Sequence, residues 1–232
     1  MLTPSKNLHG LLLVDKERGS TSFQIVSQLR RLTKERTIGH AGTLDPFATG
    51  VMVMLIGREF TRQSDSFLSS DKSYRATLTL GVATDSYDLD GQVMAQSDFV
   101  PALEQVEGAL SSFQGEIQQI PPMFSAKKIQ GEKLYDLARK GITIERQPVK
   151  VRLTIQLVCY SYPHLEIIVD CSKGTYIRSL AHDIGQSLGC GAHLTELVRF
   201  RSGSFTLDEC IPQALLKNPD HDITPFIKKL NV

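Results

Sequence analysis

Apolar and polar positions divide the first third of the chain into a strand, a helix and a second strand. Unbroken apolar runs over 10–14 and 51–56 each predict a buried strand. Between them, Phe23, Val26 and Leu29 recur at helical spacing directly after three residues suited to capping a helix. The stretch between this helix and the second strand is rich in Gly, Thr and Pro, which is typical of a loop.

The rest of the chain continues to mix short strands with helices. We expect, in order, a short helix over 59–68, a strand over 74–80, a helix over 101–113, a strand hairpin over 151–158 and 165–171, a helix over 175–188 and a strand over 194–205. No regular alternation of strand and helix runs through this order. The pattern therefore favours an α+β fold with a mixed sheet over a doubly wound parallel one.

Charge is unevenly distributed along a chain whose formal net charge is only +1. Residues 30–36 carry four cations against one acid, and residues 127–152 carry eight against three, whereas residues 81–119 carry seven acids and no Lys or Arg. The basic segments suit a polyanionic partner, and the acidic one suits a face turned away from it. An ordinary solvated surface is the alternative interpretation of the same runs.

Cysteine usage and the N-terminus indicate the compartment. The four cysteines form no C-x-x-C pair and no zinc spacing, so we expect reduced thiols that fill apolar space. The first ten residues have no apolar signal region, and no apolar run is long enough to span a membrane. We therefore expect a soluble cytoplasmic protein that makes no membrane contact.

The string from Gly39 to Gly50, GHAGTLDPFATG, is the strongest candidate for chemistry. Its glycines permit unusual backbone angles, and Pro46 pushes Asp45 toward an extended conformation. A short carboxylate on a stiff loop between a helix and a strand is well placed for a nucleophile. An isolated Asp-Pro more commonly caps a turn, and only the whole string favours the chemical interpretation.

Two further strings extend this pattern. Residues 71–75 read DKSYR at the start of a predicted strand, and residues 171–178 read CSKGTYIR, which places Arg178 in the first turn of a predicted helix. Together with the first string, and with TDSYDLDG at 84–91 and CGAHLTEL at 190–197, they resemble the TruB family of tRNA pseudouridine synthases. The resemblance runs from about residue 11 to 205.

The resemblance implies a fold and a domain organisation. We expect the pseudouridine synthase fold, with a mixed, largely antiparallel central sheet flanked by helices and loops. We expect one catalytic domain over 1–232, with a thumb-like basic insertion at about 120–150 and a short tail at 206–232. Many family members continue into a C-terminal RNA-binding domain, for which this tail is too short. We therefore expect RNA binding to depend on contacts with the T-loop of the RNA and on the thumb of the protein.

The resemblance also implies the roles of single residues. It makes Asp45 the nucleophile, Arg178 the arginine that pairs with it, and Tyr74 the residue that stacks on the target uracil and can move a proton. The expected substrate-binding residues are His40, Lys72, Tyr74, Tyr176 and Leu197.

The implied reaction is isomerisation of the T-loop uridine at tRNA position 55 to pseudouridine. The reaction breaks one bond from the ribose to uracil and forms another without redox change, so we expect no cofactor and no metal. Asp45 must be ionised, and a neighbouring Arg lowers a carboxyl pKa by roughly 1–3 units. The sequence leaves open whether Asp45 attacks ribose C1′ or uracil C6. The expected partner is the T-stem-loop of tRNA, bound by a monomer without an obligatory protein partner.

Two alternatives use the same residues. An RNA-binding folding factor that opens and re-forms the tRNA elbow would need the basic segments but not Asp45. A glycosidase would release free uracil, although such enzymes usually use two carboxylates.

Overall fold

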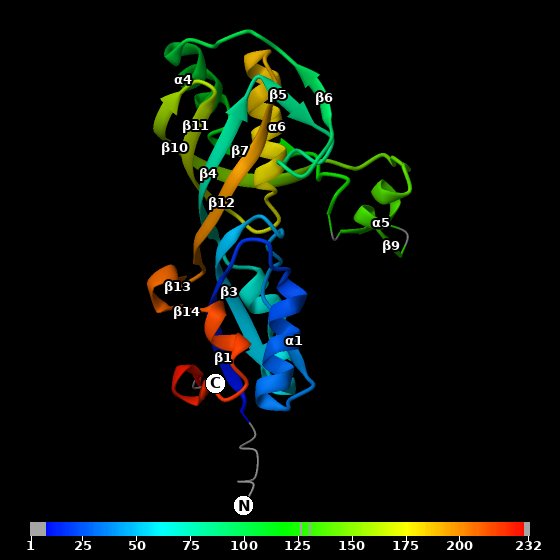
Figure 1. Ribbon diagram of the computed structural model, residues 1–232. Coiled ribbons are helices and arrows are strands. Elements are labelled where there is room, and N and C mark those ends of the chain that lie inside the picture. Colours follow the sequence, from blue (N-terminus) through cyan, green and yellow to red (C-terminus); the bar gives the residue numbers. More distant parts are fainter. Residues whose placement is uncertain (1–7, 126, 130, 230–232) are drawn as a thin grey trace, which may run out of the picture. The chain divides into compact units, whose positions relative to one another are not determined.

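The computed structural model describes residues 8–125, 127–129 and 131–229, which form two compact units (Figure 1). The first unit comprises Met1–Tyr74 and Leu197–Val232, and the second comprises Arg75–Glu196. Two strands, β4 (Lys72–Leu80) and β12 (Ala192–Ser202), contribute residues to both units. The expectation of a single catalytic domain stays a prediction.

The first unit contains short strands and helices from both ends of the chain. Its elements are β1 (Gly10–Lys16), α1 (Ser22–Thr33), β2 (Ile38–His40), β3 (Thr49–Ile56), α2 (Arg58–Arg62), α3 (Ser64–Leu68), β13 (Phe205–Thr206), β14 (Ile211–Pro212) and the 3₁₀ turns Leu207–Glu209, Gln213–Lys217 and Thr224–Phe226.

The second unit contains longer strands, two helices packed on them and a small outlying segment. Its elements are β5 (Val82–Thr84), β6 (Val93–Gln96), α4 (Leu103–Ser112), β7 (Gly115–Gln119), β8 (Lys128–Ile129), β9 (Glu132–Lys133), α5 (Leu134–Arg139), β10 (Val149–Ser161), β11 (His164–Cys171) and α6 (Ile177–Leu188).

The sheet strands are mixed in direction. In the first unit the order is β14-β1-β3-β12, with β2 also paired to β3; the β1–β14 and β3–β12 pairs are parallel and the β1–β3 pair is antiparallel. In the second unit β12 is followed by β4, β11, β10 and β7, and the β11–β10 and β10–β7 pairs are antiparallel. The prediction of an α+β fold with a mixed sheet is confirmed.

Helix α1 forms where the capping residues predicted it, but it buries a different stripe. Thr21 accepts a hydrogen bond from the Gln24 backbone N–H, and the Gln24 side chain accepts one from the Thr21 N–H, so the first turn is capped reciprocally. The buried side chains include Ile25, Val26 and Leu29, whereas Phe23 is 64% exposed. The prediction that Phe23 lies on the buried stripe is wrong, because the core-facing side of the helix is rotated away from it.

Several boundaries differ from the predicted ones. The loop predicted over 39–50 is shorter, because β2 includes His40 and β3 begins at Thr49. Strands β6 and β7 were not predicted, since β6 is wholly exposed and β7 is mostly polar, so neither has a buried alternating face. Cys159 is exposed, contrary to the expected filling role, while Cys171 and Cys190 are buried.

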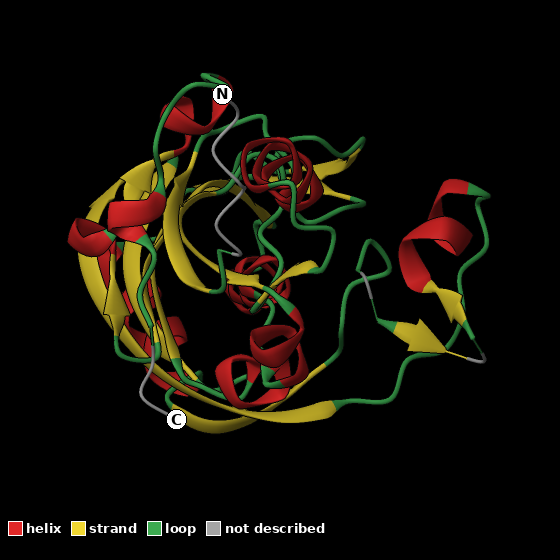
Figure 2. Ribbon diagram, turned by 90° about the horizontal axis from the view of Figure 1, so that it is seen from below, coloured by secondary structure: helices red, strands yellow, loops and turns green. Residues whose placement is uncertain are grey.

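Residues 127–129 and 131–146 carry the basic insertion predicted at about 120–150. A hairpin of β8 and β9 leads into α5, and both views show this segment reaching away from the strands of its unit (Figures 1 and 2). Arg146 donates to the Pro121 carbonyl oxygen at 3.1 Å, which joins the two ends of the insertion. Helix α5 follows β9 directly and is a short helix of six residues.

Candidate functional site

The loop that carries Asp45 is fixed on both sides of this residue. On one side, the Ser22 hydroxyl at the start of α1 donates to the Leu44 carbonyl oxygen and accepts from the Leu44 N–H, each at 3.1 Å. On the other, the Gly19 N–H donates to the Pro46 carbonyl oxygen at 2.8 Å. Asp45 itself is half-buried. The carboxylate therefore sits on a rigid turn with partial access to solvent.

Lys16 holds the same loop from the end of β1. Its ammonium is fully buried and donates to the carbonyl oxygens of Pro46 at 3.0 Å and Ala48 at 2.6 Å. Burial lowers the pKa of Lys16 to about 8; the charge of Asp45 opposes this shift and that of Arg199 adds to it. Lys16 thus brings a buried cation into the electrostatic surroundings of Asp45.

Arg199 on β12 is the third residue that holds the Asp45 loop. This arginine is 1% exposed and donates to the Val51 carbonyl oxygen at 2.8 Å and the Gly42 carbonyl oxygen at 3.1 Å, which lie at the two ends of the loop. Gly50 must be glycine here, because its φ is +101° and an added Cβ would lie 2.2 Å from the Arg199 carbonyl oxygen. Gly50 therefore allows the Arg199 backbone to approach the end of the loop closely.

His40 precedes the loop at the end of β2. Its Nδ1 is buried and has no hydrogen-bond partner among the described residues. Burial, and secondarily the charge of Arg199, lower the pKa of His40. The imidazole is therefore kept neutral near physiological pH, which suits an apolar or stacking contact with a base.

Three more of the expected site residues belong to the first unit and are buried. Tyr74 on β4 is 7% exposed, and Leu197 on β12 is 6% exposed. Lys72 is 8% exposed and donates to the Leu68 and Ser70 carbonyl oxygens at 3.2 and 2.7 Å. A Cβ added to Gly42 would lie 3.6 Å from the Lys72 Cε, so this lysine adjoins the Asp45 loop.

Arg178 lies in the first turn of α6 in the second unit, as predicted. It is 6% exposed and forms an ion pair with Asp88, which is 5% exposed, at 3.4 Å. It also donates to the carbonyl oxygens of Ser86 at 3.2 Å and Phe124 at 2.7 Å. Asp45 belongs to the other unit, and the expected pairing of Arg178 with Asp45 stays a prediction.

Tyr176 stands directly before α6 and is held through its backbone. Its N–H donates to the Gln119 side-chain oxygen at 2.8 Å, and its carbonyl oxygen accepts from the Gln119 amide nitrogen at 3.0 Å. The buried Gln119 at the end of β7 thereby fixes the chain that leads into Arg178.

Sequence reasoning missed four residues that hold these groups in place: Lys16, Asp88, Gln119 and Arg199. Asp88 lies within the acidic string at 84–91, yet nothing in the string indicated which acid is buried. Burial against a partner distant in sequence is invisible in a single chain's pattern. The signal available for Arg199 was its spacing of two residues from Leu197, which places both side chains on the same face of a strand.

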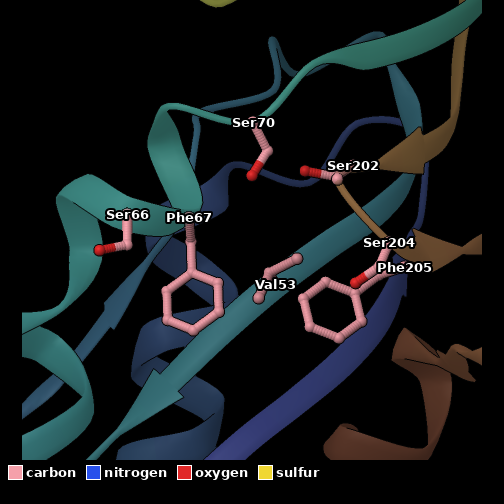
Figure 3. Close-up of a pocket in the computed structure, with 8 residues that line it drawn as sticks. Val53, Ser66, Phe67, Ser70, Ser202, Ser204 and Phe205 are labelled. Carbon is pink, nitrogen blue, oxygen red and sulfur yellow. The ribbon is translucent and has the colours of Figure 1, made fainter.

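The first unit also contains a cavity of about 250 Å³ (Figure 3). Phe67, Val53 and Phe205 form one side of it, and Ser70 and Ser202 point toward it from the other. None of the predicted site residues lines this cavity. The described part of the chain contains no cluster of His, Cys, Asp or Glu that could hold a metal ion. Among the same residues, no helix is long and apolar enough to cross a bilayer.

Comparison with known proteins extends the likeness over most of the chain. The model of the TruB family pseudouridylate synthase N-terminal domain matches residues 30–177, and that of the tRNA pseudouridylate synthase B C-terminal domain matches residues 178–219. Proteins named tRNA pseudouridine synthase B are 60% identical in Protochlamydia amoebophila, over 90% of this chain and 80% of that protein, and 58% identical in Chlamydia pneumoniae, over 94% and 93%.

A solved structure of lower sequence identity has a similar fold. The Cbf5-Nop10-Gar1 complex contains a chain that is 28% identical and superposes with a TM-score of 0.70 over 90% of this chain. Our chain spans about half of that protein, 54% of its length. Because the family models cover residues 30–219 without interruption and both relatives match 90% or more of this chain, the chain belongs to the TruB family of pseudouridylate synthases.

Proposed function

We propose that this protein isomerises uridine to pseudouridine in tRNA, at the T-loop uridine of position 55, with Asp45 as the nucleophile. The observation that carries the proposal is the Asp45 loop, which Ser22, Lys16 and Arg199 hold from three directions. A loop fixed in this way keeps a carboxylate in one position while a substrate is placed against it. The names of the relatives support the substrate class.

The reaction needs one anionic group and no outside reactant. The bond between ribose C1′ and uracil N1 breaks, the base turns, and C1′ joins C5 while the C5 proton moves to a nitrogen, so atoms and electrons balance within the substrate. Asp45 bonds transiently to C1′ or C6. The buried cations Lys16 and Arg199 both donate hydrogen bonds to backbone carbonyl oxygens of the loop that carries Asp45.

The other residues form the pocket for a flipped base in this proposal. A uridine that leaves its stack needs an aromatic surface to replace the lost stacking, worth roughly 1–3 kcal/mol per base. Tyr74 supplies that surface and a hydroxyl for proton transfer, and Leu197 and Tyr176 exclude water. His40, held neutral, fills the space the base leaves in the RNA, and Arg178 approaches the Asp45 carboxylate. Lys72 adjoins the Asp45 loop and is a substrate-binding residue in this proposal.

We further propose that the enzyme acts in the cytoplasm as a monomer without an obligatory protein partner. Purified protein alone should then convert a tRNA transcript made in vitro. Sedimentation at working concentration should give the mass of one chain, and a requirement for a second protein would contradict this part.

The decisive experiment compares wild type with Asp45→Asn on tRNA labelled in its uridines. Wild type should form pseudouridine at one T-loop position. The variant keeps the shape of the side chain but loses the anion, so product should fall below detection while tRNA binding changes by less than about threefold. Asp65→Asn, an exposed acid on α3, is the matched control and should be fully active.

The same experiment separates the alternatives. A folding factor would act equally well with either residue at 45, and its effect on tRNA structure would not depend on product. A glycosidase would leave an abasic site and free uracil. Pseudouridine formed by Asp45→Asn at the wild-type rate would overturn the proposed mechanism.

A further inference from the structure

Five large apolar side chains lie exposed within eleven residues of the second unit. Val93 and Met94 on β6 are 56% and 68% exposed, and Phe99, Val100 and Leu103 on the chain into α4 are 44%, 55% and 45% exposed. Figure 1 shows β6 beside β5, with the chain from β6 running over to α4. Exposed apolar residues scattered singly are normal, whereas five within eleven residues of the chain are typical of a segment that contacts a partner. We refer to these five residues as the exposed apolar face.

The elements that carry this face already have their own packing on the other side. Helix α4 buries Val106, Ala109 and Leu110 and contacts α6 and β10. Strand β6 pairs with β5 alone among the described strands. The core of the unit is therefore complete without the exposed apolar face, whose side chains point into solvent.

Carboxylates are interspersed along the sequence with the residues of the exposed apolar face. Five exposed acids lie on the same segment: Asp85, Asp90, Asp98, Glu104 and Glu107. None of them forms an ion pair with any described residue, and residues 81–119 contain no Lys or Arg. Their negative potential is thus uncompensated within the segment.

We propose that the exposed apolar face docks a basic amphipathic segment of another protein. Apolar side chains of that segment would cover Met94 and its neighbours, and its Lys or Arg residues would pair with the interspersed acids. RNA and anionic membranes carry the wrong charge for this surface. A second copy of the chain would bring two sets of acids together, which also opposes binding. This proposal is independent of the enzymatic function proposed above.

The geometry of β6 favours side-chain contacts over addition of a strand. Ala83 pairs with Ala95 and Thr84 with Val93, so Met94 is an extra residue that bulges from the ladder. A bulge on an edge strand interrupts the regular row of donors and acceptors that a new strand needs. Met94 is also the most exposed of the five residues.

The test uses the full-length protein and a defined probe. The probe is a fluorescein-labelled peptide of about four helical turns, with Leu along one face and Lys elsewhere. A peptide of the same composition in scrambled order is the control for charge alone. We expect the probe to bind with a dissociation constant on the order of micromolar, and the scrambled peptide about tenfold more weakly. Amide exchange should slow at residues 92–105 when the probe binds.

Two variants locate the binding. Met94→Lys combined with Val100→Lys should weaken probe binding by about tenfold or more, because it removes apolar contact and adds like charge. Val158→Lys on β10, 39% exposed in wild type, is the matched control and should bind as wild type does. Both proteins should keep full activity on tRNA, which shows that they are folded and that the face is separate from the active site.

Three results would overturn the proposal. One is absence of probe binding, and another is equal affinity for the scrambled peptide or for the double variant, which would indicate charge alone. The third is concentration-dependent dimerisation that the double variant abolishes, since this would assign the exposed apolar face to a second copy of the chain.

Discussion

At the scale of single residues, the site depends on cations and acids that the chain buries in pairs or against carbonyl oxygens. Lys16 and Arg199 are both almost fully buried, and both donate hydrogen bonds to backbone oxygens of one loop. Buried charges are costly unless they are paired or hydrogen-bonded. The free-energy cost of burying these two cations is therefore offset by hydrogen bonds that keep the Asp45 loop in one position.

Asp88→Asn tests the corresponding pair in the second unit. Breaking a buried ion pair leaves an uncompensated charge and destabilises a protein by about 3–5 kcal/mol. Arg178 would lose the carboxylate at 3.4 Å that orients it. We expect kcat to fall by about tenfold or more with little change in KM, since Arg178 would be misplaced while RNA contacts remain.

Asp90→Asn, two residues away and exposed, is the control for this change. It should leave kcat and the unfolding free energy unchanged. If Asp88→Asn showed wild-type kcat and wild-type stability in urea, the orienting role of Asp88 would be wrong.

At the scale of elements, helix α6 combines a stable core face with one unfavourable charge. Its buried residues include Leu180, Ala181, Ile184 and Leu188, and Gly189 ends it with a φ of +75°. The next turn after Arg178 carries Asp183, which is half-buried and has no ion pair or hydrogen bond among the described residues. Burial raises the pKa of Asp183 from 3.8 to about 6.

Asp183→Asn should therefore stabilise the protein above pH 6. Between pH 3.8 and about 6 the folded state holds more protons at Asp183 than the unfolded state, so the unfolding free energy falls as pH rises. Above about pH 6 Asp183 is ionised in the folded state, and the full unfavourable free energy of burying this anion lowers the stability. We expect the variant to gain about 1 kcal/mol at neutral pH, because partial solvent access reduces the cost.

Urea unfolding at neutral and acid pH measures this difference. The gain should vanish below pH 3.8, where both states protonate Asp183 in the wild type. Asp98→Asn, an exposed acid, should show no gain at any pH. An equal gain at acid pH would mean that packing, and not charge, is responsible.

At the scale of the whole molecule, charge is sorted between segments. The basic insertion at 127–129 and 131–146 reaches away from the strands of its unit, and the acidic segment at 81–119 carries the exposed apolar face. A polyanion attracted to the first would be repelled by the second. Under the two proposals above, the basic insertion would bind RNA and the exposed apolar face would bind another protein.

Lys127→Glu combined with Lys128→Glu tests the role of the insertion. We expect tRNA binding to weaken on the order of tenfold at low salt, and the dependence on salt to flatten, because each lost phosphate contact lowers the slope by about 0.9. Filter binding across a range of salt concentrations measures both. Lys229→Glu, an exposed lysine elsewhere, is the control, and an unchanged slope in the double variant would remove the insertion from RNA binding.

Local pattern was enough to predict most elements and the family, because helix caps, apolar runs and the three strings depend on neighbours in the chain. Thr21 caps α1 and Gly189 ends α6 as their residue types require. Asp45, Tyr74 and Arg178 were predicted as site residues for the same reason, since each lies in a contiguous string. Strand β6 was not predicted, because its side chains are all exposed and the sequence shows no alternation of apolar and polar residues there.

Only the tertiary structure identified the groups that hold the site in place. Lys16, Arg199 and Asp88 look like surface charges in the sequence. Each is buried, and each contacts a partner that is 30 or more residues away in the chain. Burial depends on which distant segments meet, and the pattern of one chain does not encode that directly. The sequence alone therefore determined which chemistry the chain carries, whereas the packing of distant segments decided which charges hold that chemistry in position.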